Sequence, residues 1–202
     1  MNKKGIQGKI ITCLSSQTTF TQKEILKLQY ALELLKNEGI KTIVLLAFFA
    51  YIGQLKAFLL CMAIACTVRI FAGGMHMKTN LGCFLFSFVL LCTEILILPS
   101  WISASRLTYT LLLTFSTTAI CLLSPLASFK RPFKGEARYR MCRRNAILFS
   151  ILWWALFAFL FPDGALRACG IWVLTLQALQ MIITYIYRYL KKEEETAKCS
   201  KR

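Results

Sequence analysis

The chain has 202 residues, of which 57% are hydrophobic, and yet it carries a formal net charge of +16. That combination is rare in a soluble domain of this length and is typical of an integral membrane protein. The nine cysteines are an odd number, and most lie in or beside apolar runs, where a thiol packs as a small hydrophobe, so the sequence argues against a disulfide framework.

The first predicted element is an amphipathic helix over residues 21–39. Thr21 and Glu24 have capping-box spacing at its start, and Gly39 is predicted as its C-terminal cap. Apolar residues recur at helical spacing and alternate with lysines and glutamates. We therefore interpret residues 1–38 as interfacial amphipathic helices on the inner membrane surface; the alternative is a soluble helix packed on its own loops.

The apolar stretch 40–72 decides the number of membrane spans. It is longer than the ~20 residues of one crossing and slightly short for two. Gly53 and Lys56 interrupt it, which favours a hairpin of two short helices turning near Gly53. With the later apolar runs at 81–98, 107–123, 146–161 and 165–187, the predicted fold class is all-α, a polytopic membrane protein with about six transmembrane helices. A single long tilted helix over 40–72 would leave five.

The distribution of basic residues favours six spans. With six, all lysines and arginines except Lys56, Arg106 and Arg167 lie on the inner side, whereas five spans would turn the basic segment 130–144 outward, against the positive-inside rule. The prediction is a transmembrane domain over 39–202 with a basic cytoplasmic loop at 124–145 and both termini in the cytoplasm. Because this pattern already explains the charge, we expect no nucleic acid partner.

The segment from Arg69 to Cys83 collects the residues that could carry chemistry. His76 is the only histidine, and in a continuous helix it would lie ~10.5 Å along the axis from Cys83, beyond hydrogen-bonding reach. The helix must therefore be broken. Gly73 and Gly74 can supply the break, and Thr79 or Asn80 can cap the helix that follows. This places Cys83 in a first helical turn.

A cysteine in that position is a candidate nucleophile. The positive end of the helix macrodipole and a neighbouring imidazole both favour the thiolate, so we predict Cys83 as nucleophile and His76 as base. Backbone N–H groups of the same turn could stabilise an oxyanion. Arg69 could hold a substrate carboxylate or carbonyl, or simply snorkel at a helix end. No metal-ligand spacing is present, and no cofactor is expected.

These residues, in this spacing, resemble the signature of the accessory gene regulator B (AgrB) family of membrane peptidases. The likeness extends to the helix containing Tyr30 and Glu33 and to the basic loop from Pro125 to Arg144, so it covers nearly the whole chain. Met75 and Met77 depart from the family pattern, which bears on substrate fit more than on chemistry.

The resemblance implies roles for particular residues. Cys83 matches the family's nucleophile and His76 its base. Positions regarded as important for substrate binding or for the shape of the site are matched by Arg69, Gly73, Gly74 and Glu33. No third catalytic group is assigned.

The resemblance also implies a reaction. An AgrD-like precursor peptide would be cleaved near the cytoplasmic face of a bacterial cell membrane, giving an acyl-enzyme thioester that an internal thiol or hydroxyl captures as a thiolactone or lactone ring, the autoinducing peptide of quorum sensing. A homodimer among membrane lipids is expected on the same ground. Two readings without this chemistry compete: a small transporter or peptide exporter that uses the intramembrane Glu94, and a structural or assembly protein.

Overall fold

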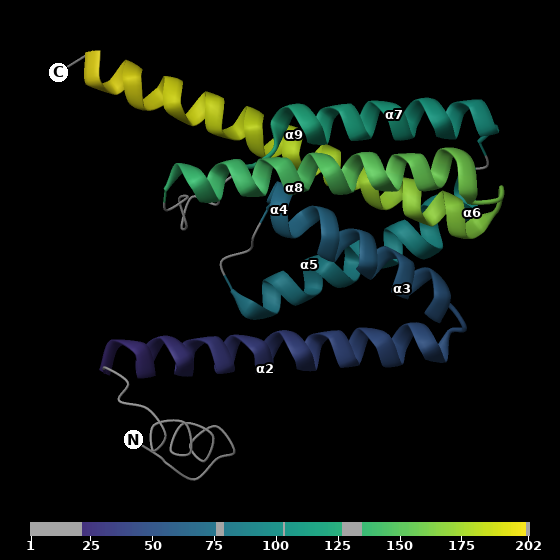
Figure 1. The fold of residues 1–202 in the computed structure, drawn as a ribbon, viewed down its shortest axis with the longest axis horizontal. Helices are drawn as coiled ribbons and strands as arrows, with labels where there is room; N and C mark the ends of the chain where they lie inside the picture. Colours follow the sequence, from purple (N-terminus) through teal and green to yellow (C-terminus); the bar gives the residue numbers. More distant parts are fainter. Residues whose placement is uncertain (1–21, 76–78, 103, 127–134, 201–202) are drawn as a thin grey trace, which may run out of the picture. The chain divides into compact units, whose positions relative to one another are not determined.

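The computed structural model describes residues 22–75, 79–102, 104–126 and 135–200, and the chain divides into two compact units, Met1–Ile52 and Gly53–Arg202. In the described part of the first unit, helix α2 runs from Gln22 to Tyr51 (Figure 1). The predicted cap pair begins at Thr21, which lies outside the described residues.

The predicted C-terminal cap at Gly39 is wrong, because α2 continues through it. An interior glycine costs a helix only about 1 kcal/mol, and local bonds bridge this point. Lys41 Nζ donates to Glu38 Oε1 at 2.7 Å, and Thr42 Oγ1 donates to the Glu38 carbonyl at 2.9 Å. The apolar residues after Gly39 therefore continue the same helix instead of beginning a separate short one.

The turn predicted near Gly53 is confirmed. Helix α2 ends at Tyr51, Gly53 has a φ of 74°, and the next helix begins at Leu55. A positive φ of this size is one that glycine adopts without steric cost.

Five helical segments of the described chain are long and apolar enough to cross a membrane, on length and composition alone: Leu55–Ala72, Asn80–Trp101, Arg106–Leu123, Glu136–Leu160 and Ala165–Lys191. They match the apolar runs read from the sequence after Gly53. Helix α2 is not among them, so the sixth span stays a prediction.

Three of these segments contain a π-helical turn. The first consists of α3 (Leu55–Ile64), η1 (Ala65–Arg69) and α4 (Ile70–Ala72), and the second of α5 (Asn80–Cys92), η2 (Thr93–Ile97) and α6 (Leu98–Trp101). The others are α7 (Arg106–Leu123), α8 (Glu136–Ala155) followed by η3 (Leu156–Leu160), and α9, which runs on to Ser200 from Ala165. Helix α8 begins at Glu136, so part of the predicted cytoplasmic loop 124–145 is helical. Within the described residues there is no strand, only an isolated parallel bridge between Gly73 and Leu126.

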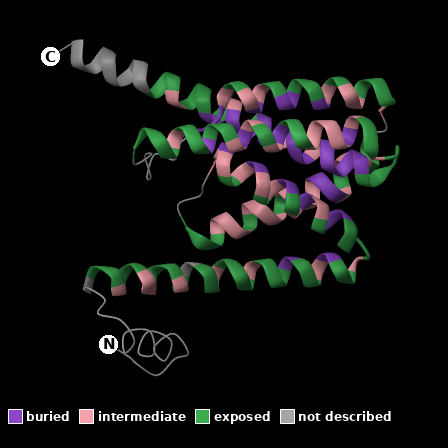
Figure 2. Ribbon diagram, viewed as in Figure 1, coloured by how far each residue is buried: buried purple, intermediate pink, exposed green. Residues whose placement is uncertain are grey.

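Helix α9 is the centre of the second unit. It packs against α7, α3, α6 and η2, and Figure 1 shows it running beside α7. In its most apolar stretch 61% of the residues are buried, against 17–33% in the other candidate spans. Figure 2 shows the same difference, since α7 and α8 turn mostly exposed residues outward. The apolar outer faces are what a lipid-facing helix bundle requires.

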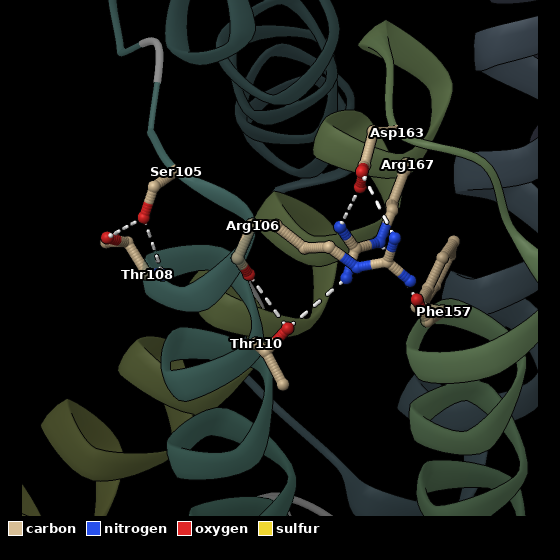
Figure 3. A network of polar contacts seen from close by, with 7 residues as sticks. All are labelled: Ser105, Arg106, Thr108, Thr110, Phe157, Asp163 and Arg167. Atoms are coloured by element: carbon tan, nitrogen blue, oxygen red, sulfur yellow. Dashed lines mark hydrogen bonds and ion pairs between the residues drawn. The ribbon is translucent and has the colours of Figure 1, made fainter.

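A polar network closes one end of this bundle (Figure 3). Arg167, 2% exposed, donates from Nε to the Phe157 carbonyl at 2.9 Å and from Nη1 to Asp163 at 2.5 Å. Its Nη2 reaches Thr110 Oγ1 at 3.3 Å, which ties α7 to α9. The π-helical turn η3 contains Phe157, and Arg167 provides a donor for its carbonyl. The exposed Arg106 shares the same Asp163 at 3.3 Å.

We expect Arg167→Leu to lower the stability of the detergent-solubilised protein by about 2–4 kcal/mol, because it removes charge-assisted hydrogen bonds from a buried position. Arg106→Leu is the matched control: its pair with Asp163 is solvent-exposed and should contribute about 1 kcal/mol or less. Thermal unfolding of both variants beside the wild type measures the difference. Equal melting temperatures for the two variants would contradict the structural role of Arg167.

Candidate functional site

The backbone around Gly73 is held by several hydrogen bonds. Helix α4 ends there with a φ of 85°, and Gly73 N donates to the Arg69 carbonyl at 2.9 Å. Leu126 N donates to the Ala72 carbonyl at 2.9 Å, and Gln177 Nε2 donates to the Gly73 carbonyl at 2.7 Å. The predicted helix break is therefore present, and segments far away in the chain hold it.

Gly73 also allows a close approach that no other residue would permit. A Cβ built on it would lie 2.2 Å from the Leu126 carbonyl oxygen, well inside contact distance. Gly74 differs: a Cβ there would meet Arg69 Nε and Gln177 Nε2 at 3.6 Å, an ordinary contact. The two predicted glycines thus have different physical roles, one in backbone packing and one beside a polar space.

Arg69 turns from the end of η1 toward this loop. Its Nη2 donates to the Met75 carbonyl at 3.1 Å, so the guanidinium holds the backbone one residue before His76. Cys83 and Glu94, both on the next span, lie within electrostatic range of the same guanidinium. This contact places the guanidinium at the loop that follows the helix end, so both interpretations of Arg69, a substrate-binding residue and a snorkelling side chain, stay predictions.

Cys83 lies in the first turn of α5, as predicted. Thr79 is the N-cap, with extended backbone and its Oγ1 accepting from Gly82 N at 3.1 Å. Cys83 N donates to the Thr79 carbonyl at 3.0 Å, which starts the helical hydrogen bonding. The thiol is partly exposed and forms no disulfide. A partly exposed thiol in the first turn of a helix, with a guanidinium in electrostatic range, is in a suitable environment for a nucleophile.

The first turn of α5 has fewer free donors than the sequence suggested. The N–H groups of Gly82 and Cys83 are both bonded to Thr79. Only Asn80 and Leu81 are left without a backbone N–H partner among the described residues, and both are exposed. An oxyanion beside Cys83 would therefore be stabilised by these two groups, by Arg69, or by both.

We expect Thr79→Ala to weaken the start of α5 by about 1 kcal/mol, because it removes the side-chain acceptor of Gly82 N. Thr79→Ser keeps a hydroxyl at the cap and should behave as wild type. The loss would appear both in thermal unfolding and as slower alkylation of Cys83 by iodoacetamide, measured by peptide mass spectrometry. A Thr79→Ala protein whose Cys83 reacts at the wild-type rate would show that the cap does not position the thiol.

The structure brings together three of the six residues predicted from the sequence: Arg69, Gly73 and Gly74. Cys83 lies on the next span, where it interacts electrostatically with Arg69. His76 lies outside the described residues. Glu33 is exposed on α2 in the first unit, which is described separately.

Two glutamines on α9 that line this loop were not predicted from the sequence. Gln177 and Gln180 are 6% and 7% exposed and line the Gly73–Gly74 loop from the centre of the bundle. A signal was available, because buried polar residues in a candidate membrane span are costly and often functional. Glu94, which the sequence suggested only for a transporter, is 6% exposed in η2 and interacts electrostatically with Arg69.

Comparison with known proteins gives a consistent result. The profile of the family described as Accessory gene regulator B matches residues 8–190. A protein of Clostridium beijerinckii described as AgrB-like is 26% identical over 168 residues, which cover 83% of this chain and 82% of that protein. No solved structure of another protein matches the chain.

Proposed function

The chain belongs to the Accessory gene regulator B family, and from this premise we propose that it is a membrane cysteine endopeptidase that converts an AgrD-like precursor into a cyclic peptide. Family membership indicates a role in processing a quorum-sensing peptide. The cysteine chemistry is our proposal. The observation that carries it is the position of Cys83, in a capped first helical turn with Arg69 in electrostatic range.

In the proposed reaction, the Cys83 thiolate attacks the carbonyl carbon of the precursor's scissile peptide bond. The new C–S bond gives a thioester when the C–N bond breaks, and His76 supplies the proton that the departing amine takes. A thiol or hydroxyl inside the bound fragment then gives its proton to His76 and attacks the thioester, a ring closes, and Cys83 leaves as thiolate. Arg69 would stabilise the negative charge that develops on the carbonyl oxygen in both steps.

Ring closure requires the site to limit water. Exchange of one thioester for another is nearly balanced in free energy, whereas hydrolysis runs strongly downhill. The internal nucleophile must therefore be held close to the thioester. A loop fixed from α9, from Arg69 and from Leu126 is the kind of rigid support that such positioning needs.

Charge supports a cytoplasmic location for the proposed site. The Gly73–Leu126 bridge and the Arg106–Asp163 pair mark opposite ends of the second unit. Helix α8 starts at Glu136 on the Gly73 side, and its first turns carry Arg138, Arg140, Arg143 and Arg144. The positive-inside rule favours the cytoplasm for this end, and with it cytoplasmic termini. A homodimer remains part of the proposal on family grounds alone.

Co-expression of the chain with AgrD-like precursors, particularly one encoded beside it, tests the proposal. Mass spectrometry should detect a released C-terminal tail and an N-terminal product one water lighter than the linear fragment. A linear fragment without the lighter product would support cleavage of the peptide bond and contradict ring closure. An intact precursor inside cells and in the medium, with every candidate tried, would reject both.

One observation favours a second candidate, a small peptide transporter. Glu94 is buried in a π-helical turn of a candidate span, and no hydrogen bond or ion pair engages it among the described residues. Such acids often mark transport paths. The two functions separate cleanly, because an exporter would move a peptide of unchanged covalent structure and would not need Cys83.

A further inference from the structure

A small polar space lies on the side of Gly74 where other residues carry a Cβ. Three side chains surround it: Arg69 Nε and Gln177 Nε2, each 3.6 Å from the Cβ position, and Gln180 Oε1 at 3.9 Å. They come from the first candidate span and from the central helix α9. Two donors and one acceptor therefore converge on the position that a Cβ would occupy.

The three groups have hydrogen-bonding capacity left over. Gln180 is 7% exposed, and its Oε1 is buried without a hydrogen-bond partner. Arg69 uses Nη2 for the Met75 carbonyl, and its Nε has no partner among the described residues. Gln177 Nε2 carries two hydrogens and spends one on the Gly73 carbonyl. A buried acceptor without a partner costs free energy unless a ligand or water satisfies it.

We infer that this space is a subsite for a backbone amide of the substrate peptide, an inference that rests on the proposed function. A peptide group presents a carbonyl oxygen, which suits the Arg69 and Gln177 donors, and an N–H, which suits Gln180 Oε1. A carboxylate would satisfy only the donors and would face the Gln180 oxygen. The Arg69 guanidinium relates the subsite to Cys83, since its Nε borders the subsite and the same group interacts electrostatically with Cys83.

The subsite also explains the glycine at position 74. Its backbone does not adopt the left-handed conformation of Gly73, and a Cβ would make only ordinary contacts. Alanine should therefore fold there and fill the space. Gly74→Ala and Gln180→Leu should both prevent the amide from binding, by different means. The alanine methyl group occupies the place of the amide, and leucine lacks the acceptor oxygen of Gln180.

Two probes with an identical chloroacetamide group test the inference on the full chain in detergent. One continues with a peptide amide and the other with an ester in its place, so only the second lacks the N–H. In each case Cys83 sulfur displaces chloride from the chloroacetyl carbon. The alkylation rate at Cys83, measured by peptide mass spectrometry and normalised to the rate with glutathione, gives an amide-to-ester ratio that does not depend on how reactive the thiol is.

We expect the ratio to be about threefold to tenfold in the wild type, the size of one hydrogen bond to a buried acceptor. It should fall to about one in both Gly74→Ala and Gln180→Leu, while Gly39→Ala, a glycine with open space around it, keeps the wild-type ratio. A wild-type ratio of one, or a preference that survives both variants, overturns the subsite and leaves the proposed function standing. If Cys83 reacts with neither probe, the site is closed to peptides, and both proposals are rejected.

Discussion

Cys83→Ala is expected to abolish release of the precursor's C-terminal tail, a fall in rate of about a thousandfold or more. The proposed reaction passes through a thioester on this sulfur, and loss of a covalent nucleophile removes the whole pathway rather than slowing one step. Tail release from a co-expressed precursor, followed by gel and mass spectrometry at matched amounts of membrane protein, measures the effect. His76→Ala should cost about a hundredfold to ten-thousandfold, the usual contribution of a positioned base.

Cys66→Ala is the matched control for this prediction. Cys66 is exposed on η1, three residues before Arg69, and is a free thiol like Cys83, but it has no place in the proposed reaction. Its variant should process the precursor at the wild-type rate. If Cys83→Ala still processes the precursor, Cys83 is not the nucleophile and the transporter becomes the favoured function. If both variants lose processing, substitutions anywhere in the first two spans disturb the protein, and the loss is not specific to Cys83.

Short sequence patterns predicted much of this site. Apolar runs predicted the spans after Gly53, the glycine pair predicted the break after α4, and Thr79 was one of two predicted caps. Each of these signals acts within a few residues, where caps and backbone preferences decide structure. The same kind of signal failed at Gly39, because a glycine cap competes with continuation of the helix and the Glu38–Lys41 pair favours continuation.

The contacts that hold the site together join segments that are far apart in the sequence. Gln177 reaches Gly73 across 104 residues, and Leu126 pairs with the end of α4 from the far end of α7. A hydropathy pattern does not tell which helix lies at the centre of a bundle, because all these spans are apolar. The two glutamines of α9 could have been flagged as costly in a membrane, but their partner follows only from the packing of α9 against the first span.

Gly73→Ala is expected to cost about 3 kcal/mol or more of stability and to abolish processing. A non-glycine residue at a φ of 85° and a ψ of −170° loses about 1–3 kcal/mol from backbone strain alone. The added Cβ would also lie 2.2 Å from the Leu126 carbonyl oxygen, and moving that backbone breaks the bond from Leu126 N to Ala72. Thermal unfolding in detergent and tail release from the precursor report the two losses.

Gly53→Ala separates the two causes. Gly53 has a similar φ of 74°, but a Cβ there would meet nothing within 4 Å, so its variant should show the strain without the collision and lose only about 1–2 kcal/mol. Because the atom in the way at Gly73 belongs to the main chain, Leu126→Ala should not rescue Gly73→Ala. Equal losses at the two glycines, or rescue by Leu126→Ala, would mean that the close backbone contact does not hold the loop. In that case the rigidity proposed for ring closure would have to come from Arg69 and Gln177 alone.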